Sequence, residues 1–493
     1  MKKEDGYFRF IFRKPQLVDW IVIAVVVTLG CLINTIWYPY PRTMGDSFGY
    51  LWSAIRDEFT YLRPFGYSFY LQLVHVFSDS LYSVIVSQAL IYTLSLGLFL
   101  LAVKKFWPPM KRWRFVVFEV VAALSPSAIF MLNTILSDTL QCSLVFLMIA
   151  MVIVMIKEES WLAMGIYVLA LFASFNTRYT SEFFPLAFIP VLALKGKRIF
   201  RIVSIALTVV AFALFYVQRT NNMEETSGQK QFSTGFEGWQ LASNAIHMIP
   251  FLSEEEKANM PKDKDLRELH QFVTGFEKAH GKIASSTKNG KEATASFIWE
   301  YDSPLKQYFF RKVGDNNYGN EWIVIGTKLF KKYGKWLILS HPGRFIKYYL
   351  IPNTKQAFFT TRNEVVFGDE NVPAGKAEVV EWFDVPEDLA LTPRGQGLGN
   401  VLKPVLPWIE LATWLIMLAS LVVMFASGKK VKFPRDTKLV LWVLFLFGVI
   451  YYGAVTFASP IALRYWMPMH AVKLVFAWIA VNETLRIRAS QAR

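Results

Sequence analysis

Long apolar runs constrain the fold of this chain more than any other feature. Residues 17–37 carry one charged side chain, Asp19, near their start and otherwise read IVIAVVVTLGCLINTIW. A helix rises about 1.5 Å per residue, so about 20 apolar residues cross the ~30 Å hydrocarbon core of a bilayer. Runs of comparable length predict six more membrane-spanning helices, at residues 81–103, 137–156, 199–217, 409–426, 439–457 and 462–481. Three shorter runs, 115–125, 161–175 and 183–194, would have to tilt, extend into polar flanks or stop partway.

The composition agrees with a membrane protein. Of 493 residues, 54% are hydrophobic and only 18% are charged, and the mean hydropathy is +0.31. A soluble chain carries about 25% charged residues. We therefore expect an α-helical polytopic membrane protein with about ten transmembrane helices. The first run is too long for a cleavable signal peptide, and YPYPR follows it in place of a small-residue cleavage site.

The net charge of +15 lies in segments at alternate ends of the predicted spans. Positive loops of this kind face the cytoplasm, so both termini are predicted to be cytoplasmic. The long segment 218–404 then lies on the outer side, and it is nearly neutral, with 24 Lys plus Arg against 23 Asp plus Glu. This pattern excludes a nucleic-acid-binding surface. The basic segments are KKEDGYFRFIFRK, KKFWPPMKRWR, KGKRIFR, GKKVKFPRDTK and RIRASQAR.

The spans divide the chain into three parts. Residues 1–217 form an N-terminal transmembrane block with seven spans, residues 218–404 form a mostly helical extracytoplasmic domain, and residues 405–493 form a block with three spans. The first exterior loop, 38–80, contains SFGYLWSAIRDEFTYL, whose apolar residues recur at helical spacing. This spacing predicts an amphipathic helix in the plane of the membrane interface.

Metal and disulfide chemistry are not expected. Cys31 and Cys142 both lie inside apolar runs, and the exterior segment has no cysteine, so no disulfide is predicted there. The six histidines show no spacing of metal ligands, and no phosphate-binding glycine loop or Ser-His-Asp pattern occurs. No metal and no cofactor are predicted.

A small set of polar residues lies close to the exterior ends of the spans. Ionisable groups near bilayer depth are costly and usually face a partner or a cavity. Two acids and three arginines on one face suggest a site for an anionic lipid head group, with a carboxylate left to remove a proton. The candidate residues are Asp46, Ser47, Tyr50, Arg63, Asp138, Arg178, Tyr179, Glu182, Arg464 and Tyr465.

Each charged candidate also has a purely structural interpretation. Asp46 could be the N-cap of the amphipathic helix, and Asp138 could cap the fourth span in the same way. The three arginines could be interface anchors whose long side chains reach out to water. Asp57 and Glu58 are interpreted as the solvated face of the helix.

The order of these segments resembles the GT-C membrane glycosyltransferases, and more narrowly their protein O-mannosyltransferase and aminoarabinose-transferase branch. The resemblance covers residues 15–217 and, more faintly, 405–482. It rests on an acid after the first span, an amphipathic exterior helix and an Arg-Pro turn before the second span. The matching segments are GDSFGYL, LRPFGYSFYL, LSPSAIFMLNTILSDTL, NTRYTSEFFPLAFIP and ALRYWMPMH.

The resemblance implies roles for individual residues. The family's catalytic base falls on Asp46, its phosphate-binding residue before the loop proline on Arg63, and its second acid on Asp138. From the residue types we further hypothesise that Arg63 with Arg178 or Arg464 holds the phosphate and that Asp138, as a second catalytic acid, orients the acceptor or an arginine. The expected substrate contacts are Ser47, Tyr50, Tyr179, Glu182 and Tyr465. The sequence departs from the pattern in having Ser47 where the mannosyltransferases often have a second acid, and it lacks a DxD metal motif.

The function implied is an inverting transfer of a sugar from a polyprenyl-phosphate donor to a lipid, glycan or protein acceptor. The expected setting is a bacterial inner membrane, with residues 218–404 in the periplasm. A transporter or flippase of a lipid-linked glycan or another anion is the alternative, although the chain shows no repeated halves. A ligase of the O-antigen type would place its chemistry in a late exterior loop.

Overall fold

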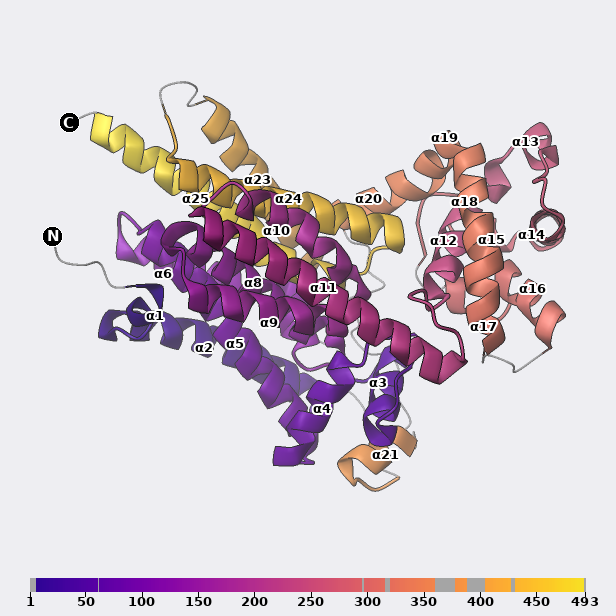
Figure 1. The fold of residues 1–493 in the computed structure, drawn as a ribbon, viewed down its shortest axis with the longest axis horizontal. Coiled ribbons are helices and arrows are strands. Elements are labelled where there is room, and N and C mark those ends of the chain that lie inside the picture. Colours follow the sequence, from indigo (N-terminus) through magenta and orange to yellow (C-terminus); the bar gives the residue numbers. More distant parts are fainter. Residues whose placement is uncertain are drawn as a thin grey trace. The chain divides into compact units, whose positions relative to one another are not determined.

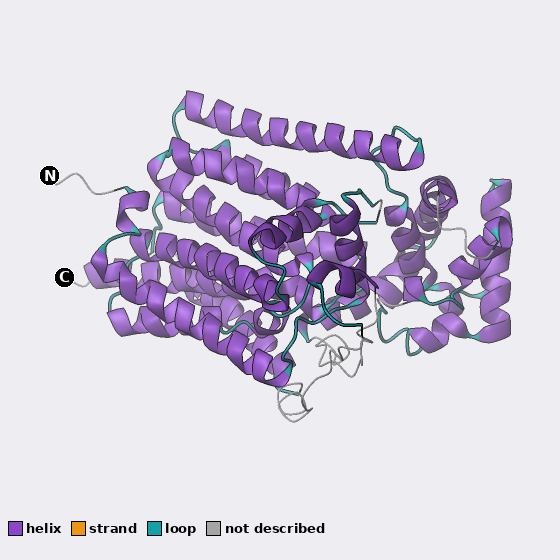
Figure 2. Cartoon of the chain, turned by 90° about the horizontal axis from the view of Figure 1, so that it is seen from below, coloured by secondary structure: helices purple, strands orange, loops and turns teal. Residues whose placement is uncertain are grey.

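A computed structural model describes residues 6–60, 62–294, 297–314, 320–359, 377–387, 404–426 and 431–491. Parts of the predicted exterior segment 218–404 and of three basic segments lie outside these residues. The described residues contain helices and loops but no β-strand (Figure 2). The expected α-helical class is therefore confirmed.

The chain divides into two compact units. Unit 1 comprises residues 1–215, 361–451 and 463–493, and unit 2 comprises residues 216–360 and 452–462. The predicted boundaries at residues 217 and 404 separate the transmembrane blocks from a segment outside the membrane. The division into units does not test them, so they stay predictions.

Unit 1 is a bundle in which several long helices run beside one another (Figure 1). Its centre is α8, which packs against α5 and α9. The most apolar stretch of α8 is 83% buried inside the protein. The corresponding stretch of α23 is only 17% buried, so α23 lies at the periphery. The helices of unit 1 are α1 (Tyr7–Phe10), α2 (Leu17–Trp37), α3 (Gly45–Arg56), α4 (Gly66–Phe77), α5 (Leu81–Phe106), α6 (Arg112–Ala123), α7 (Pro126–Met131), α8 (Ser137–Glu158), α9 (Trp161–Thr177), α10 (Phe184–Leu192), α21 (Ala377–Phe383), α23 (Leu406–Ala426) and α25 (Met467–Gln491). Two helices continue past the boundary of unit 1, namely α11 (Arg198–Ser227) and α24 (Arg435–Ala458).

Six described helices are long and apolar enough to cross a membrane. They correspond to six of the ten predicted spans, and they run over Lys14–Ile36, Leu81–Phe106, Ser137–Glu158, Arg198–Ser227, Pro407–Ala426 and Arg435–Ala458. Their outward faces carry many exposed large apolar side chains, as expected where lipid is the solvent. The chain is thus a membrane protein.

The four remaining predicted spans differ from these six. The short runs form α6, α9 and α10, with 12, 17 and 9 residues. The run at 462–481 begins as a short 3-10 turn, η9 (Leu463–Trp466), and becomes helical only at Met467. Helix α25 is not among the six. It carries buried polar groups, among them Lys473, whose ammonium group lies 3.0 Å from Oε2 of Glu410 on α23.

The predicted amphipathic helix forms α3, but it is shorter than expected. It ends at Arg56 because Asp57 adopts a left-handed conformation with φ of 54°. Phe59, one of the apolar residues of SFGYLWSAIRDEFTYL that recur at helical spacing, therefore lies beyond the helix. Leu51 is fully buried, whereas Trp52 remains 38% exposed. Helix α3 packs against α4 and α21 within unit 1, and its position at a membrane interface stays a prediction.

The described residues of unit 2 form helices and loops. Its core includes Trp239, stacked on Trp322 with 3.6 Å between the ring centroids. Backbones come very close beside this pair, since a Cβ on Gly238 would lie 1.9 Å from the carbonyl oxygen of Gly326. Only glycine fits such an approach. The helices of unit 2 are α12 (Phe236–Ile246), α13 (Glu254–Ala258), α14 (Lys264–His280), α15 (Lys282–Ser286), α16 (Pro304–Val313), α17 (Asn320–Ile325), α18 (Lys331–Ser340), α19 (Pro342–Phe345) and α20 (Ile351–Phe358).

Candidate functional site

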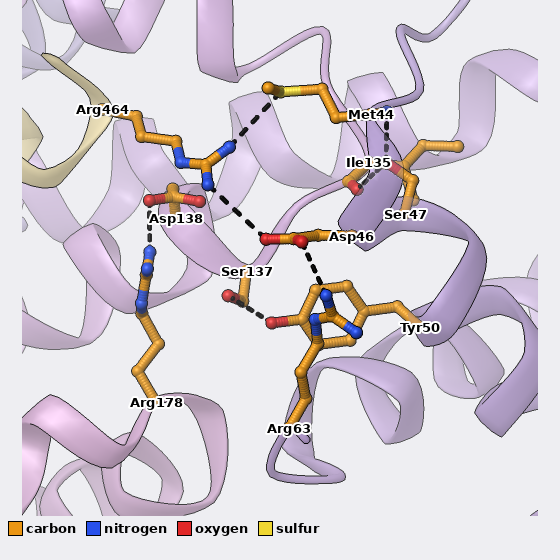
Figure 3. Close-up of polar contacts among 10 residues, drawn as sticks. All are labelled: Met44, Asp46, Ser47, Tyr50, Arg63, Ile135, Ser137, Asp138, Arg178 and Arg464. Carbon is orange, nitrogen blue, oxygen red and sulfur yellow. Dashed lines mark hydrogen bonds and ion pairs between the residues drawn. The ribbon is translucent and has the colours of Figure 1, made fainter. Parts of the chain in front are cut away.

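Five charged candidates come together in unit 1, although they lie far apart in the sequence (Figure 3). Asp46 lies in the first turn of α3, and Arg63 lies in the turn before α4. Asp138 lies in the first turn of α8, Arg178 directly follows α9, and Arg464 lies in η9.

The carboxylate of Asp46 bridges two guanidinium groups. Its Oδ1 accepts a hydrogen bond from Nη2 of Arg63 at 2.6 Å, and its Oδ2 lies 3.5 Å from Nη2 of Arg464. Each carboxylate oxygen thus has its own arginine. Nη1 of Arg464 points to the sulfur of Met44, at 3.4 Å.

The interpretation of Asp46 as an N-cap is wrong. The N-cap of α3 is Met44, and Asp46 is the second residue of the helix. The start of the helix is instead held by Ser47, whose Oγ accepts from the backbone N–H of Met44 at 2.8 Å and donates to the carbonyl of Ile135 at 2.7 Å. The Asp46 carboxylate is therefore available for the arginines.

Asp138 and Arg178 form the second ion pair of the site, between Oδ1 and Nη1. The N-cap of α8 is Leu136, so the interpretation of Asp138 as a cap is also wrong. The side chain of Asp138 is only 4% exposed. An uncompensated carboxylate at such a position would be strongly unfavourable, so the pair holds the end of α9 to the start of α8.

A buried polar cluster fixes the backbone around Arg178. Nε2 of Gln141 on α8 donates to Oγ of Ser174 on α9 and to Oγ of Ser181, both at 2.9 Å. Ser181 belongs to η2 (Tyr179–Phe183), which also contains the candidates Tyr179 and Glu182. The two serine hydroxyls are 2.8 Å apart. These bonds hold the backbone on both sides of Arg178, between the end of α9 and η2, in a fixed position.

Two tyrosines support the arginines. The guanidinium of Arg63 lies over the ring of Tyr50, at 5.5 Å from its centroid. Those of Arg178 and Arg464 lie 5.1 and 5.4 Å from the ring of Tyr465. Such cation–π contacts stabilise closely spaced cations by about 0.5–2 kcal/mol each.

The hydroxyl of Tyr50 also belongs to this network. It lies 2.9 Å from Oγ of Ser137, the residue before Asp138. Burial raises the pKa of Tyr50, so its phenol keeps its proton. The middle of α3 and the start of α8 are thereby joined next to the two carboxylates.

Backbone bonds align the loop before α3 with the loop before α8. The N–H of Arg42 donates to the carbonyl of Asn133 at 2.7 Å, and the carbonyl of Arg42 accepts from Ile135 at 2.9 Å. The side chain of Asn133 donates to the carbonyls of Tyr38 and Tyr40, at 3.1 and 3.2 Å. The two acidic helix starts are therefore held at fixed positions.

The net charge of the site favours binding of an anion. Three arginines face two aspartates, which leaves a formal charge of +1. The Nε of Arg464 is buried and has no hydrogen-bond partner among the residues that the structure describes. The site therefore has both a net positive charge and a spare N–H donor.

Asp46 remains the most accessible of the charged groups. Its side chain is 37% exposed, against 16% for Arg464 and 18% for Arg63. Burial opposes its ionisation, but the guanidinium groups of Arg63 and Arg464 outweigh this effect and hold its pKa below the ordinary value of 3.8. A carboxylate in this setting is charged at neutral pH.

No group of three or more His, Cys, Asp or Glu side chains within the described ranges is arranged to hold a metal ion. Both acids of the site are engaged by arginines. Guanidinium groups are suited to bind an anion, and a charged carboxylate beside them is suited to accept a proton.

Sequence reasoning missed several residues that position the charged groups. Met44 contacts Arg464, Gln141 fixes the surroundings of Arg178, and the hydroxyl of Tyr451 donates to the carbonyl of Tyr465 at 2.5 Å. Gly49 leaves space for Arg63. Gly49 could have been singled out from the sequence. Glycine inside a helix is about 1 kcal/mol less favourable than alanine, so its presence indicates that a side chain would not fit at that position.

Comparison with known proteins gives no relative on which to base a role for these residues. No family model matches the sequence, and a search of curated proteins finds no match.

Proposed function

We propose that this chain is a membrane glycosyltransferase of the GT-C type. It moves a sugar from a polyprenyl-phosphate donor to a hydroxyl group of a lipid, glycan or protein acceptor. The observation that carries the proposal is the accessible carboxylate of Asp46, bridged by Arg63 and Arg464 beside the Asp138–Arg178 pair. A transfer from a phosphate-linked sugar needs cations for the phosphate and a base for the hydroxyl, and these contacts combine both.

The proposed step is a single displacement. The oxygen of the acceptor hydroxyl bonds to the anomeric carbon, while the bond from that carbon to the phosphate oxygen breaks. The bonding electron pair leaves with the phosphate, and the hydroxyl proton passes to the carboxylate of Asp46. Attack opposite to the leaving group inverts the anomeric centre.

The arginines ease departure of the phosphate. Guanidinium groups bind phosphate oxygens through pairs of charge-assisted hydrogen bonds. Arg63 and Arg464 bind the phosphate in this proposal, and Arg178, held by Asp138, adds positive charge beside them. Ser47 fixes the start of the helix that carries the base.

The proposed setting is a bacterial inner membrane with the site on its outer side. Both termini lie in the cytoplasm, ten segments span or enter the bilayer, and residues 218–404 lie in the periplasm. The alternation of basic segments and the six long apolar helices support this arrangement.

The test is to remove the protein from its host and compare envelope lipids, glycans and secreted proteins by mass spectrometry. We expect one sugar modification to disappear, to return with the wild-type chain, and to stay absent with the Asp46→Asn variant. If every sugar modification is unchanged in the deleted strain, the proposal is wrong. If a lipid-linked glycan accumulates on the cytoplasmic side, a flippase is favoured instead.

A further inference from the structure

We propose that the carboxylate of Asp46 and the phosphate of the donor compete for Arg63 and Arg464, so that the arriving phosphate frees Asp46 to act as the base. This inference rests on the proposed function and adds an order of events to it. The donor binds first, and the base becomes effective only once the donor is in place.

The geometry of Asp46 is that of a bound anion. Its two oxygens each face one guanidinium, with Nη2 of Arg63 at 2.6 Å and Nη2 of Arg464 at 3.5 Å. A phosphodiester also spreads one negative charge over two non-bridging oxygens. The same pair of cations can therefore accept either group, and both cannot be satisfied fully at once.

Asp46 can leave the arginines more easily than a fully buried carboxylate could. Its side chain is 37% exposed, against 18% for Arg63 and 16% for Arg464, so water reaches the carboxylate and weakens its ion pairs. A phosphate offers stronger bonds, since guanidinium–phosphate contacts are charge-assisted and often bidentate. Nε of Arg464 is buried and has no hydrogen-bond partner in the described part of the chain, so the guanidinium keeps a donor that Asp46 does not use.

The second ion pair of the site does not share these properties. Asp138 is 4% exposed and uses Oδ1 alone to bind Arg178. Releasing it would separate a buried charge from its hydrogen-bonded partner, which is costly. Competition by phosphate is therefore confined to Asp46, and the Asp138–Arg178 pair stays in place.

Release changes the strength of the base. While Arg63 and Arg464 hold the carboxylate, they outweigh the effect of burial and the pKa of Asp46 lies below its ordinary value. A carboxylate that accepts protons so weakly is a poor general base. Once phosphate neutralises the arginines, the remaining burial favours the protonated form, and Asp46 takes a proton more readily.

The test measures binding of polyprenyl monophosphate, without a sugar, to the purified full-length chain in nanodiscs. We expect the Asp46→Asn variant to bind it about three- to tenfold more tightly than the wild type, because the competing charge has gone, while transfer is lost. The Arg63→Gln and Arg63→Gln/Asp46→Asn variants serve as controls, and both should bind weakly. If Asp46 is the catalytic base but does not compete with phosphate for the arginines, the wild type and the Asp46→Asn variant should bind polyprenyl monophosphate equally well.

The outcomes separate the two proposals. Equal or weaker binding by the Asp46→Asn variant overturns the competition but leaves the transferase intact. No measurable binding to the wild type overturns the transferase and the competition together. Infrared difference spectra of the wild type provide a measurement without substitution. They should show that the carboxylate band of an ion-paired aspartate shifts when polyprenyl monophosphate is added, and an unchanged band contradicts the competition.

Discussion

Gly49 lies directly beside Arg63, so that a Cβ on Gly49 would come within 2.7 Å of Nη1 of the arginine. The glycine is one turn along α3 from Asp46, on the helix that supplies the proposed base. The place of Arg63 therefore depends on the absence of a side chain at residue 49.

The substitution Gly49→Ala should displace Arg63 and weaken donor binding. We expect kcat/KM for transfer to fall about tenfold, equivalent to about 1.4 kcal/mol. The fold should be retained, because alanine favours a helix more than glycine does. The measurement is transfer at low donor concentration, together with thermal unfolding.

Gly45→Ala is the matched control on the same helix. A Cβ at Gly45 meets nothing within 4 Å, so this variant should keep wild-type activity. Equal activity of the two variants would contradict the role given to the space at Gly49.

Removing Arg178 should destabilise the protein more than removing Arg63. Arg178→Gln takes from the buried Asp138 its hydrogen-bonded cation and leaves Arg464 as the nearby positive charge, and breaking a buried pair costs up to about 3–5 kcal/mol. Arg63→Gln leaves Asp46, which is partly exposed and still near Arg464, and should cost about 1 kcal/mol or less. Denaturant unfolding in detergent measures both losses.

A second substitution checks the cause of this difference. Adding Asp138→Asn to Arg178→Gln removes the uncompensated charge and should recover much of the lost stability. If the double variant is as unstable as Arg178→Gln alone, the ion pair does not explain the loss.

A buried ion pair also joins α23 to α25. Nζ of Lys473 lies 3.0 Å from Oε2 of Glu410, and each side chain is 2% exposed or less. Lys473→Met alone should lower stability by about 3–5 kcal/mol, whereas Lys473→Met with Glu410→Gln should be much closer to the wild type. Thermal unfolding of the two variants gives the comparison, and similar losses in both would show that the charge is unimportant.

Unit 2 should lose stability as the pH falls below 6.5. His247 is buried, its Nδ1 donates to the carbonyl of Ser243, and burial lowers its pKa to about 4. The unfolded chain therefore binds a proton near pH 6.5, whereas the folded chain binds one only near pH 4. This contribution is complete above pH 6.5 and is lost between pH 6.5 and 4, to a total of about 3 kcal/mol.

Hydrogen exchange of the α12 amides in the full-length chain, followed between pH 7 and pH 4, measures this loss after correction for intrinsic rates. His247→Gln should remove most of the acid sensitivity. Some should remain, because burial lowers the pKa of His270 and His341 as well. An unchanged profile in the variant would contradict the assignment.

The sequence was sufficient to predict the helical membrane class, because apolar runs of span length permit few other structures. Six predicted spans have the required length and apolar character. The run at 462–481 was predicted as a span of full length, but its helix begins only at Met467. This helix also contains buried polar groups such as Lys473, paired with Glu410, which a hydropathy scale counts only as a penalty.

The candidate residues could be named from the sequence, but their pairing could not. Asp46 and Arg464 are 418 positions apart, and nothing local indicates that η9 approaches α3. The capping interpretations failed because each helix begins earlier than the pattern suggested, which leaves Asp46 and Asp138 inside the first turn. Ser47 contacts Ile135, Tyr50 contacts Ser137 and the ring of Tyr465 lies beside Arg178, and no local sequence pattern predicts these contacts across the fold.

The most direct test of the central claim is sugar transfer by the purified chain in liposomes that contain a polyprenyl-phosphate sugar and the acceptor found by mass spectrometry. The wild type should transfer the sugar with inversion, and Asp46→Asn should lower the rate at least about 100-fold with an unchanged unfolding temperature. Wild-type transfer by the Asp46→Asn variant would contradict the account.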